Sequence, residues 1–405
     1  MPRLTPFFAL VPLLTTLACE DSRPVEPVEE SMLRVVSGDG QSGLIGVPLS
    51  DSLVIEVRDE NGPRSNVSVT FTALGGGTFS PPAATTDAAG RAMALWIPGE
   101  GADSVEVSAL GDRITASATG ARAGPTTTWM GRNDYVEYRA GTLPLVLSAP
   151  HGGTMEPAEI PDRSWGTTVR DIYTDELAYA IADALEARTG ERPHLIVSHL
   201  HRRKLDPNRE IVEAAQDNPR AQQTWREFQA LIEHASDRVE EEFGEGYYID
   251  LHGHGHEIQR IELGYLLGAT TLGLSDQALD AGGYADNTSV PALVASSGAA
   301  LSVLLRGPDA LGTLLEDRGL PTTPSAQQPG PGDNPFFSGG YNTRRHGSFD
   351  GGPISGVQIE LNYFGVRDTP EHRALFAERL ADALAAYLPR WYPSQPTGVS
   401  ASPPR

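Results

Sequence analysis

The chain has very little of three things: cysteine, positive charge and long apolar stretches. It contains one cysteine in 405 residues, so it is held together without an intrachain disulfide. Its 31 lysines and arginines are outnumbered by 53 aspartates and glutamates, which gives a formal net charge of −22. Because phosphate backbones repel an acidic protein, the composition argues against nucleic acid as a partner. A chain of 405 residues is long enough for two or three domains.

The apolar stretch near the N-terminus, Leu4 to Ala18, is too short to span a bilayer with ease. It follows Arg3 and ends at Cys19, which is the layout of a secretory signal. The end of the stretch resembles a bacterial lipoprotein signal, in which the cysteine is lipidated, although Thr16 stands where such signals usually have leucine. We expect an exported chain whose lipid on Cys19 anchors it to the cell envelope. The alternative is an ordinary cleaved signal with an incidental cysteine.

Composition divides the rest of the chain into segments. After the signal, residues 1–19, the acidic and proline-containing residues 20–31 are expected to be an extended linker. Residues 394–405 have the composition of a disordered tail. Between these ends we expect two domains, an all-β domain over residues 32–123 and a larger domain over residues 130–393.

The all-β domain is predicted from short alternating apolar runs separated by turn clusters, a pattern typical of a β-sandwich. The runs are Leu33–Val36, Leu53–Val57, Val67–Thr72, Ala92–Ile97, Val105–Ala109 and Ile114–Ala118. Two motifs, Ser37-Gly-Asp-Gly40 and Thr85-Thr-Asp-Ala-Ala-Gly-Arg91 before Trp96, resemble bacterial immunoglobulin-like modules of the invasin/intimin type. The segment holds no cluster of ligand-type residues, so a passive spacer is favoured over an adhesion module.

The larger domain alternates apolar strands with helical patterns, which predicts an α/β fold. The expected strands are Leu143–Ala149, His194–Val197, the run around Gly246–Leu251, Leu263–Leu267 and Val357–Leu361. The expected helices are Asp171–Thr189, the apolar face from Trp225 to Val239, and Glu371–Leu388. A long proline-rich segment, residues 321–335, has the length of a lid or binding loop.

The chain is organised around Gly246–Glu257, where a buried strand runs into His252, His254 and His256 with glycines between them. Imidazoles at the end of a strand commonly hold a transition metal. Taken alone, the stretch is equally compatible with an exposed loop that binds no metal.

Other polar motifs flank the remaining strands and helices of this domain, where an α/β sheet places its ligands. They are Ser148-Ala-Pro-His-Gly-Gly153, Asp171-Ile-Tyr-Thr-Asp175, Lys204-Leu-Asp-Pro-Asn-Arg209, Gly339–Thr343 with His346, and Gln358-Ile-Glu360. In this order and spacing, residues 130–393 resemble the N-formylglutamate amidohydrolase family, which is itself similar to zinc carboxypeptidases and aspartoacylases. The resemblance implies a mixed sheet flanked by helices, a Zn²⁺ cofactor and hydrolysis of an amide bond in an N-acyl amino acid or small peptide.

The resemblance also implies the roles of individual residues. His151, His252 and Asp171 are expected to bind the metal. The third ligand is the open one, because zinc carboxypeptidases have a glutamate where this chain has Thr154, and Asp175 is the alternative to Asp171. Asp171 is also a good helix N-cap, which is its simplest structural role. Asp250 shares a strand face with His252 and is expected to orient it.

Glu360 is the expected general base, and burial among apolar neighbours would raise its pKa. Arg209 and Asn208 are expected to bind a substrate carboxylate, because a guanidinium matches that group with two hydrogen bonds. Tyr341 and His254 are further expected substrate contacts.

Two other functions stay open at this point. One is a carboxypeptidase-like peptidase that acts on cell-wall or other peptides. The other is a non-catalytic surface protein that binds through its immunoglobulin-like domain. Formylglutamate hydrolysis is normally a cytoplasmic task, so an exported member of the family suggests a different N-acylated substrate.

Overall fold

A computed structural model describes residues 32–393. The predicted signal with Cys19, the linker and the C-terminal tail lie outside the described residues, so export and lipid anchoring stay predictions. Among the described helices, none is long and apolar enough to cross a membrane.

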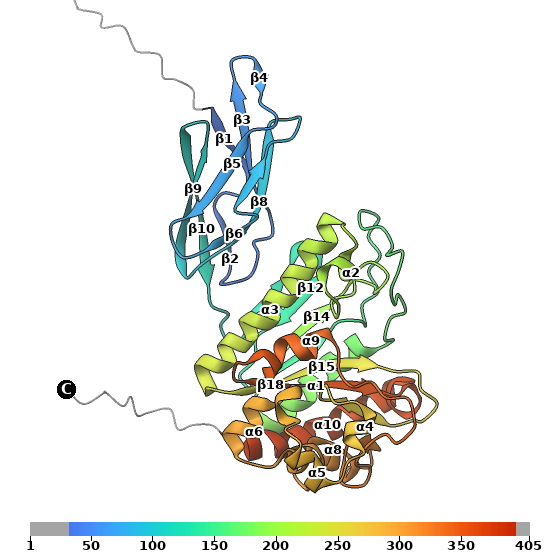
Figure 1. The fold of residues 1–405 in the computed structure, drawn as a ribbon. Helices are drawn as coiled ribbons and strands as arrows, with labels where there is room; N and C mark the ends of the chain where they lie inside the picture. Colours follow the sequence, from blue (N-terminus) through green and yellow to red (C-terminus); the bar gives the residue numbers. More distant parts are fainter. Residues whose placement is uncertain (1–31, 394–405) are drawn as a thin grey trace, which may run out of the picture.

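The first part of the described chain is a pair of five-stranded sheets (Figure 1). One sheet contains β1 (Leu33–Ser37), β3 (Leu53–Asp59), β4 (Gly62–Pro63), β6 (Thr78–Ser80) and β8 (Arg91–Ile97). The other contains β2 (Gln41–Leu44), β5 (Ser68–Ala73), β7 (Ala83–Thr85), β9 (Gly101–Ala109) and β10 (Asp112–Ala121). Each predicted run coincides with a strand, and the pattern missed only the shorter strands β2, β4, β6 and β7.

The two sheets enclose one apolar core, because alternate residues of their strands point inward. Ile55 and Trp96 come from one sheet, and Phe71 and Val107 from the other. The all-β prediction is therefore confirmed as a β-sandwich. Its assignment to the immunoglobulin-like type stays a prediction.

The second part is built on one eight-stranded mixed sheet, in the order β11-β12-β14-β13-β15-β18-β16-β17. These strands are β11 (Thr128–Met130), β12 (Val136–Arg139), β13 (Leu145–Ala149), β14 (His194–Ser198), β15 (Gly246–Gly253), β16 (Ile261–Gly264), β17 (Thr322–Thr323) and β18 (Ile354–Leu361). The central strands β14, β13, β15 and β18 are parallel. Their carboxyl ends therefore meet at one edge of the sheet, where α/β proteins place their sites.

Helices cover both faces of this sheet, as alternation in its strands requires. Leu145 and Leu147 face α1 (Thr174–Thr189) and α10 (Pro370–Trp391), whereas Val146 between them faces α3 (Pro219–Phe243). A mixed sheet flanked by helices is thus confirmed. Its similarity to a zinc carboxypeptidase stays a prediction.

Short helices make up the remainder and were not predicted. They are α2 (Ile211–Ala215), α4 (Ala269–Leu272), α5 (Asp276–Ala281), α6 (Pro291–Ser297), α7 (Leu301–Arg306), α8 (Leu311–Glu316) and α9 (Tyr341–His346). The predicted strand Leu263–Leu267 ends early, at Gly264, because Leu266 adopts a left-handed φ of 68° that a strand does not accommodate.

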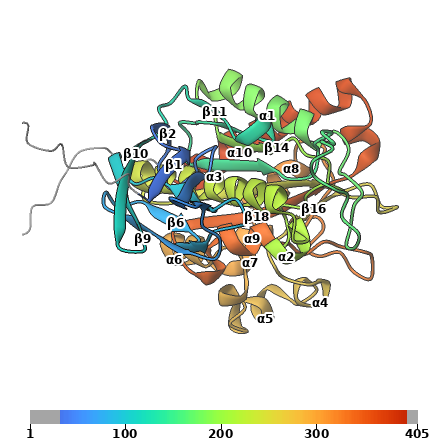
Figure 2. The same cartoon turned by 90° about the horizontal axis from the view of Figure 1, so that it is seen from above.

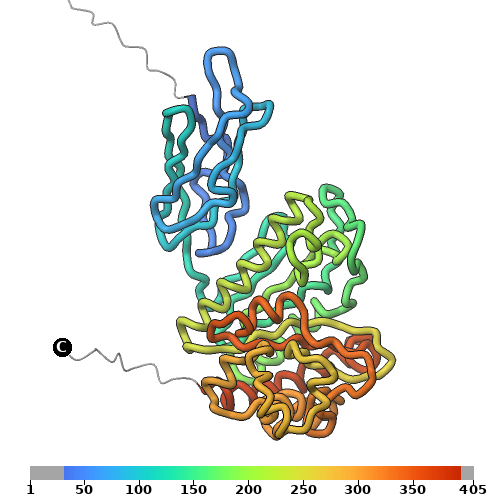
Figure 3. Tube along the Cα trace, viewed as in Figure 1, coloured from blue at the N-terminus to red at the C-terminus, as the bar shows by residue number. Residues whose placement is uncertain are grey.

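The sandwich lies beside α3, and the chain passes from β10 to the mixed sheet near the end of that helix (Figures 2 and 3). One apolar cluster includes Leu44, Val47 and Ala123 together with residues of α3 and the mixed sheet. The two parts therefore share buried surface. The predicted domain limits at residues 123 and 130 stay a prediction.

Candidate metal centre and substrate pocket

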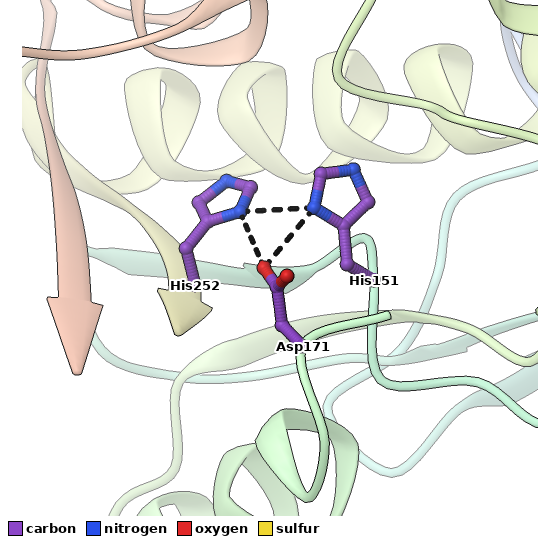
Figure 4. A group of neighbouring side chains, drawn as sticks. All are labelled: His151, Asp171 and His252. Atoms are coloured by element: carbon purple, nitrogen blue, oxygen red, sulfur yellow. Dashed lines mark hydrogen bonds and ion pairs between the residues drawn. The ribbon is translucent and has the colours of Figure 1, made fainter. Parts of the chain in front are cut away.

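Three side chains meet at the carboxyl edge of the central strands. His151 follows the end of β13, His252 lies near the end of the adjacent β15, and Asp171 comes from the loop before α1 (Figure 4). Gly153 lets the chain after His151 pass against the backbone of His199, where a Cβ would come within 2.3 Å of the carbonyl carbon.

The ligand atoms of the three residues form a nearly equilateral triangle. The two Nδ1 atoms of His151 and His252 are 3.1 Å apart, and Asp171 Oδ2 lies 3.2 Å from each of them. Ligand atoms held about 2.0 Å from a tetrahedral zinc would be about 3.3 Å from one another. The triangle therefore has the size of one face of a tetrahedral metal site.

Both imidazoles are oriented by a buried carboxylate on their far side. His151 Nε2 lies 2.7 Å from Asp206 Oδ1, and His252 Nε2 lies 2.8 Å from Asp250 Oδ2. When each Nε2–H donates to its carboxylate, each Nδ1 presents a lone pair to the triangle. Two lone pairs and a carboxylate oxygen at this spacing repel one another unless a cation lies among them, so the residues fit a metal ion.

The charges around the triangle favour a cation in the same way. Burial by itself would raise the pKa of Asp171, but the facing His151 and His252 imidazoles hold it well below its usual range. Burial would lower the pKa of His252, but Asp250 and Asp171 hold it well above its usual range. Without a metal the centre therefore retains a proton, and metal binding must displace it.

Asp206 is itself held in place by arginine. Arg202 Nε donates to Asp206 Oδ2 at 2.9 Å, and Arg163 Nη1 lies 3.8 Å from the same oxygen. Burial would raise the pKa of Asp206, but His151 and Arg202 keep it well below its usual range. Asp206 is therefore ionised, as a carboxylate that orients a metal-binding imidazole must be.

Glu360 lies next to this centre, on β18, where its Cα pairs with that of His252 on β15. Gln358 Nε2 donates to Glu360 Oε1 at 2.8 Å. Burial raises the pKa of Glu360 to about 8. The charge of His252 opposes this rise, and the negative charges of Asp171 and Glu262 add to it. A bound divalent cation would bring this pKa down again. Glu360 can therefore exchange protons near neutral pH.

A cavity of about 500 Å³ opens over the metal triangle and Glu360. Four arginines contribute to its lining: Arg170, Arg202, Arg209 and Arg367. Its other walls come mainly from Thr167, Val169, Ile172, Asn208, Gly253–His256, Phe337, Gly339, Gly340, Gln358 and Tyr363. This volume is in the range of small-molecule sites.

The structure places the two candidates for the third metal ligand differently. Asp171 joins the histidines, whereas Asp175 lies in the first turn of α1, beside Gly152. The helix N-cap is Tyr173, so Asp171 does not cap the helix through its side chain.

The predicted substrate contacts differ in how they are placed. Arg209 and Asn208 line the cavity, but Asn208 is buried and its Oδ1 accepts a hydrogen bond from Asn342 N at 2.8 Å. Tyr341 is not among the lining residues. Its ring packs near Trp225, and its hydroxyl accepts from Arg345 Nη1 at 3.0 Å, so the structure directs it away from the site.

His254 also lines the cavity, but protein groups engage both of its nitrogens. Nε2 donates to Arg260 O at 2.8 Å, and Nδ1 accepts from His256 N at 3.1 Å. These bonds give His254 a structural task in holding its loop. They also make the neighbouring group of His254, His256 and Glu262 a poor metal site, since Arg260 adds a positive charge 3.9 Å from Glu262.

Sequence reasoning missed Asp206, although it lies in the quoted motif Lys204–Arg209. The sequence feature that could have identified Asp206 is its place two residues before Asn208, within a motif assigned to the site. Its pairing with His151, 55 positions earlier, is set by the fold.

We predict that Asp206→Asn weakens zinc binding, because an amide cannot hold the His151 tautomer as a carboxylate does. The expected loss is about 10- to 100-fold in affinity, measured by competition with a chromophoric chelator. Asp162→Asn is the matched control, since Asp162 is an exposed carboxylate that pairs with Lys204 in the same region. Unchanged zinc affinity in the Asp206 variant would remove Asp206 from the centre.

Comparisons with known proteins give similarity of limited extent. No family model matches this chain, and no curated protein matches its sequence. Among solved structures, the chain is similar to N-formylglutamate amidohydrolase from Ralstonia eutropha JMP134, with 16% identity and a TM-score of 0.40 over 61% of this chain and 95% of that one. A gene product of Agrobacterium tumefaciens gives 14% identity and a TM-score of 0.37 over 63% and 95% of the two chains.

Shorter similarities involve bacterial surface proteins. The D00-D0 domain of intimin has 17% identity and a TM-score of 0.19 over 24% of this chain and 48% of that one. Invasin, described as a bacterial integrin-binding protein, has 23% identity and a TM-score of 0.19 over 28% and 22%. At these values the similarities assign no activity to this chain.

Proposed function

We propose that this chain is a zinc-dependent amidohydrolase that cleaves the amide bond of an N-acyl amino acid of the N-formylglutamate type, or of a small peptide. The observation that carries the proposal is the triangle of His151, Asp171 and His252, backed by carboxylates and placed beside a buried glutamate. Two imidazoles and one carboxylate are a common protein ligand set of catalytic zinc, which keeps one further position open.

Zinc bound by these residues would polarise an amide carbonyl and lower the pKa of a water molecule. Glu360 then removes one proton from the attacking water and delivers it to the leaving nitrogen as the C–N bond breaks. Gln358 engages Oε1 of Glu360 and limits the rotation of its carboxylate. His151 and His252 stay oriented throughout, because Asp206 and Asp250 hold their outer nitrogens.

Charge supports an anionic substrate. The chain carries a net charge of −22, yet four arginines line the cavity. The side chain of Arg209 is 34% exposed, and among the described residues the hydrogen bonds and ion pairs of its guanidinium go to Asn208 O and Glu213. It therefore has donors left for a carboxylate.

The proposal is tested by measuring formate release from N-formyl-L-glutamate by a chain that starts after Cys19. Release that stops with a zinc chelator and returns with added zinc is expected. A zinc-loaded sample that releases no formate would reject this substrate, and N-acetyl amino acids and small peptides are then assayed in the same way. A sample that retains no zinc after dialysis would contradict the metal centre itself.

We predict that Glu360→Gln lowers kcat by about 10²- to 10⁴-fold without loss of zinc, because the amide cannot accept the proton. In the parent chain, activity should rise with pH as Glu360 ionises, with a midpoint below the pKa of about 8 that it has without metal. The measurement is a pH–rate profile with zinc content determined in parallel. Glu378→Gln, on the exposed side of α10, is the control. Equal rates for Glu360→Gln and the parent would exclude Glu360 as the base.

Arg209→Ala is expected to raise KM by about 10- to 100-fold with little change in kcat, because a lost charge-assisted pair weakens ground and transition states alike. The effect should disappear with a substrate whose α-carboxylate is replaced by an amide. Arg203→Ala, which removes a neighbouring arginine outside the cavity lining, should leave both constants unchanged. A KM increase of the same size for the amide substrate would show that Arg209 does not bind the carboxylate.

A further inference from the structure

The β-sandwich is buried against the α/β part rather than tethered to it. Leu44, Val47 and Ala123 are exposed by only 4%, 1% and 4%, and they belong to the apolar cluster that covers one face of the mixed sheet. The same cluster includes Phe228 and Leu231 of α3. Separating the two parts would expose this apolar surface to water, which is unfavourable.

One histidine of α3, His234, makes two hydrogen bonds across the seam, the surface buried between the β-sandwich and α3. His234 Nδ1 donates to Ile45 O at 3.0 Å, and His234 Nε2 accepts from Ala123 N at 3.4 Å. This pattern requires the neutral imidazole, in agreement with burial, which lowers its pKa. Gln223 adds a bond to Ser50 O at 3.2 Å, and Arg122 pairs with Glu241.

The opposite side of α3 holds the loop of residues 204–210, which contains Asp206. Trp225 Nε1 donates to Arg209 O at 2.9 Å, and Gln229 Nε2 donates to Pro207 O at 2.8 Å. Trp225 and His234 are nine positions apart, which at about 100° per residue places them about 180° apart around the helix. The helix therefore lies between the sandwich and the loop and contacts both through side chains.

From the loop, the contacts continue to the metal ligands. Asp206, next to Pro207, holds His151 Nε2 at 2.7 Å and accepts from Asn208 N at 3.1 Å. The side-chain nitrogen Nδ2 of Asn208 lies 3.2 Å from His252 Nε2. Gln229 strengthens the same region through its Oε1, which accepts from His346 Nε2 at 2.6 Å.

We propose that His234 and Gln229 are positioning residues. His234 fixes α3 against the β-sandwich, Gln229 fixes the loop of Asp206 against α3, and the docked sandwich thereby helps to hold that loop in place. The sandwich is then a structural part of the metal centre. A passive spacer, the role favoured by sequence, requires no such contact and predicts that changes at the seam leave the centre unaffected.

The first readout needs no metal and no substrate. His234→Ala in the otherwise intact chain should speed amide hydrogen exchange of residues 204–210 in the metal-free protein, because α3 is released from Ile45 O and Ala123 N. Exchange in α8, which none of these bonds reaches, should be unchanged. Since this measurement does not use zinc or turnover, it tests the coupling even if the proposed amidohydrolase activity is absent.

The second readout is zinc affinity, measured by chelator competition. We expect His234→Ala to weaken zinc binding about tenfold, the lower end of the loss seen when a residue that orients a ligand is removed. His234→Gln keeps a donor and an acceptor and should recover most of the affinity. Val107→Ala creates a cavity in the sandwich core away from the seam, so it lowers stability without changing zinc affinity.

A double-mutant cycle decides whether the effect passes through Asp206. If it does, His234→Ala should cost little further affinity in an Asp206→Asn background, because the coupled group is already gone. Parent-like affinity and exchange in His234→Ala, or the same loss in both backgrounds, would overturn the proposal. Should His234→Ala not fold, Gln223→Ala removes the bond to Ser50 O and is judged by the same criteria.

Discussion

The candidate site depends on two buried carboxylate–imidazole pairs. Asp206 with His151, and Asp250 with His252, determine which nitrogen of each ring faces the centre. An imidazole free to turn or to change tautomer would present a proton to a cation about as readily as a lone pair. Fixing both rings gives the triangle the inward-facing lone pairs that a bound cation requires.

Such pairs are expensive to bury, and the surrounding structure explains how they persist. Removing an ion from water costs several kcal/mol after relaxation, and good pairing only roughly offsets this cost. Asp250 is also bonded by Ser148 at 2.7 Å and lies 3.4 Å from Asn342 Nδ2, while Asp206 is bonded by Arg202. Apolar residues of similar volume would stabilise a fold equally well, so this concentration of satisfied charge argues for function.

The sequence predicted the parts of the site that local pattern determines. His151 follows the apolar run that becomes β13, and Glu360 lies in the run that becomes β18; parallel strands bring such positions to one edge of the sheet. Asp206 was missed because its partner is set by the fold, and Tyr341 was misplaced because a glycine-rich loop does not reveal which way its side chains turn. The short helices between residues 269 and 316 carry too little periodic pattern to predict.

The position of α3 gives the two-part architecture a physical meaning. Domains joined by a linker usually move relative to one another unless their interface is large and apolar. Here the apolar residues Leu44 and Val47 enter a core that also covers the mixed sheet, and the same helix bonds the loop of Asp206. A side chain that binds a metal, or that orients such a ligand, must stay within about 0.5 Å of its working position. An element clamped on both sides therefore suits the precision that the centre requires, and it gives the sandwich a task that composition alone could not reveal.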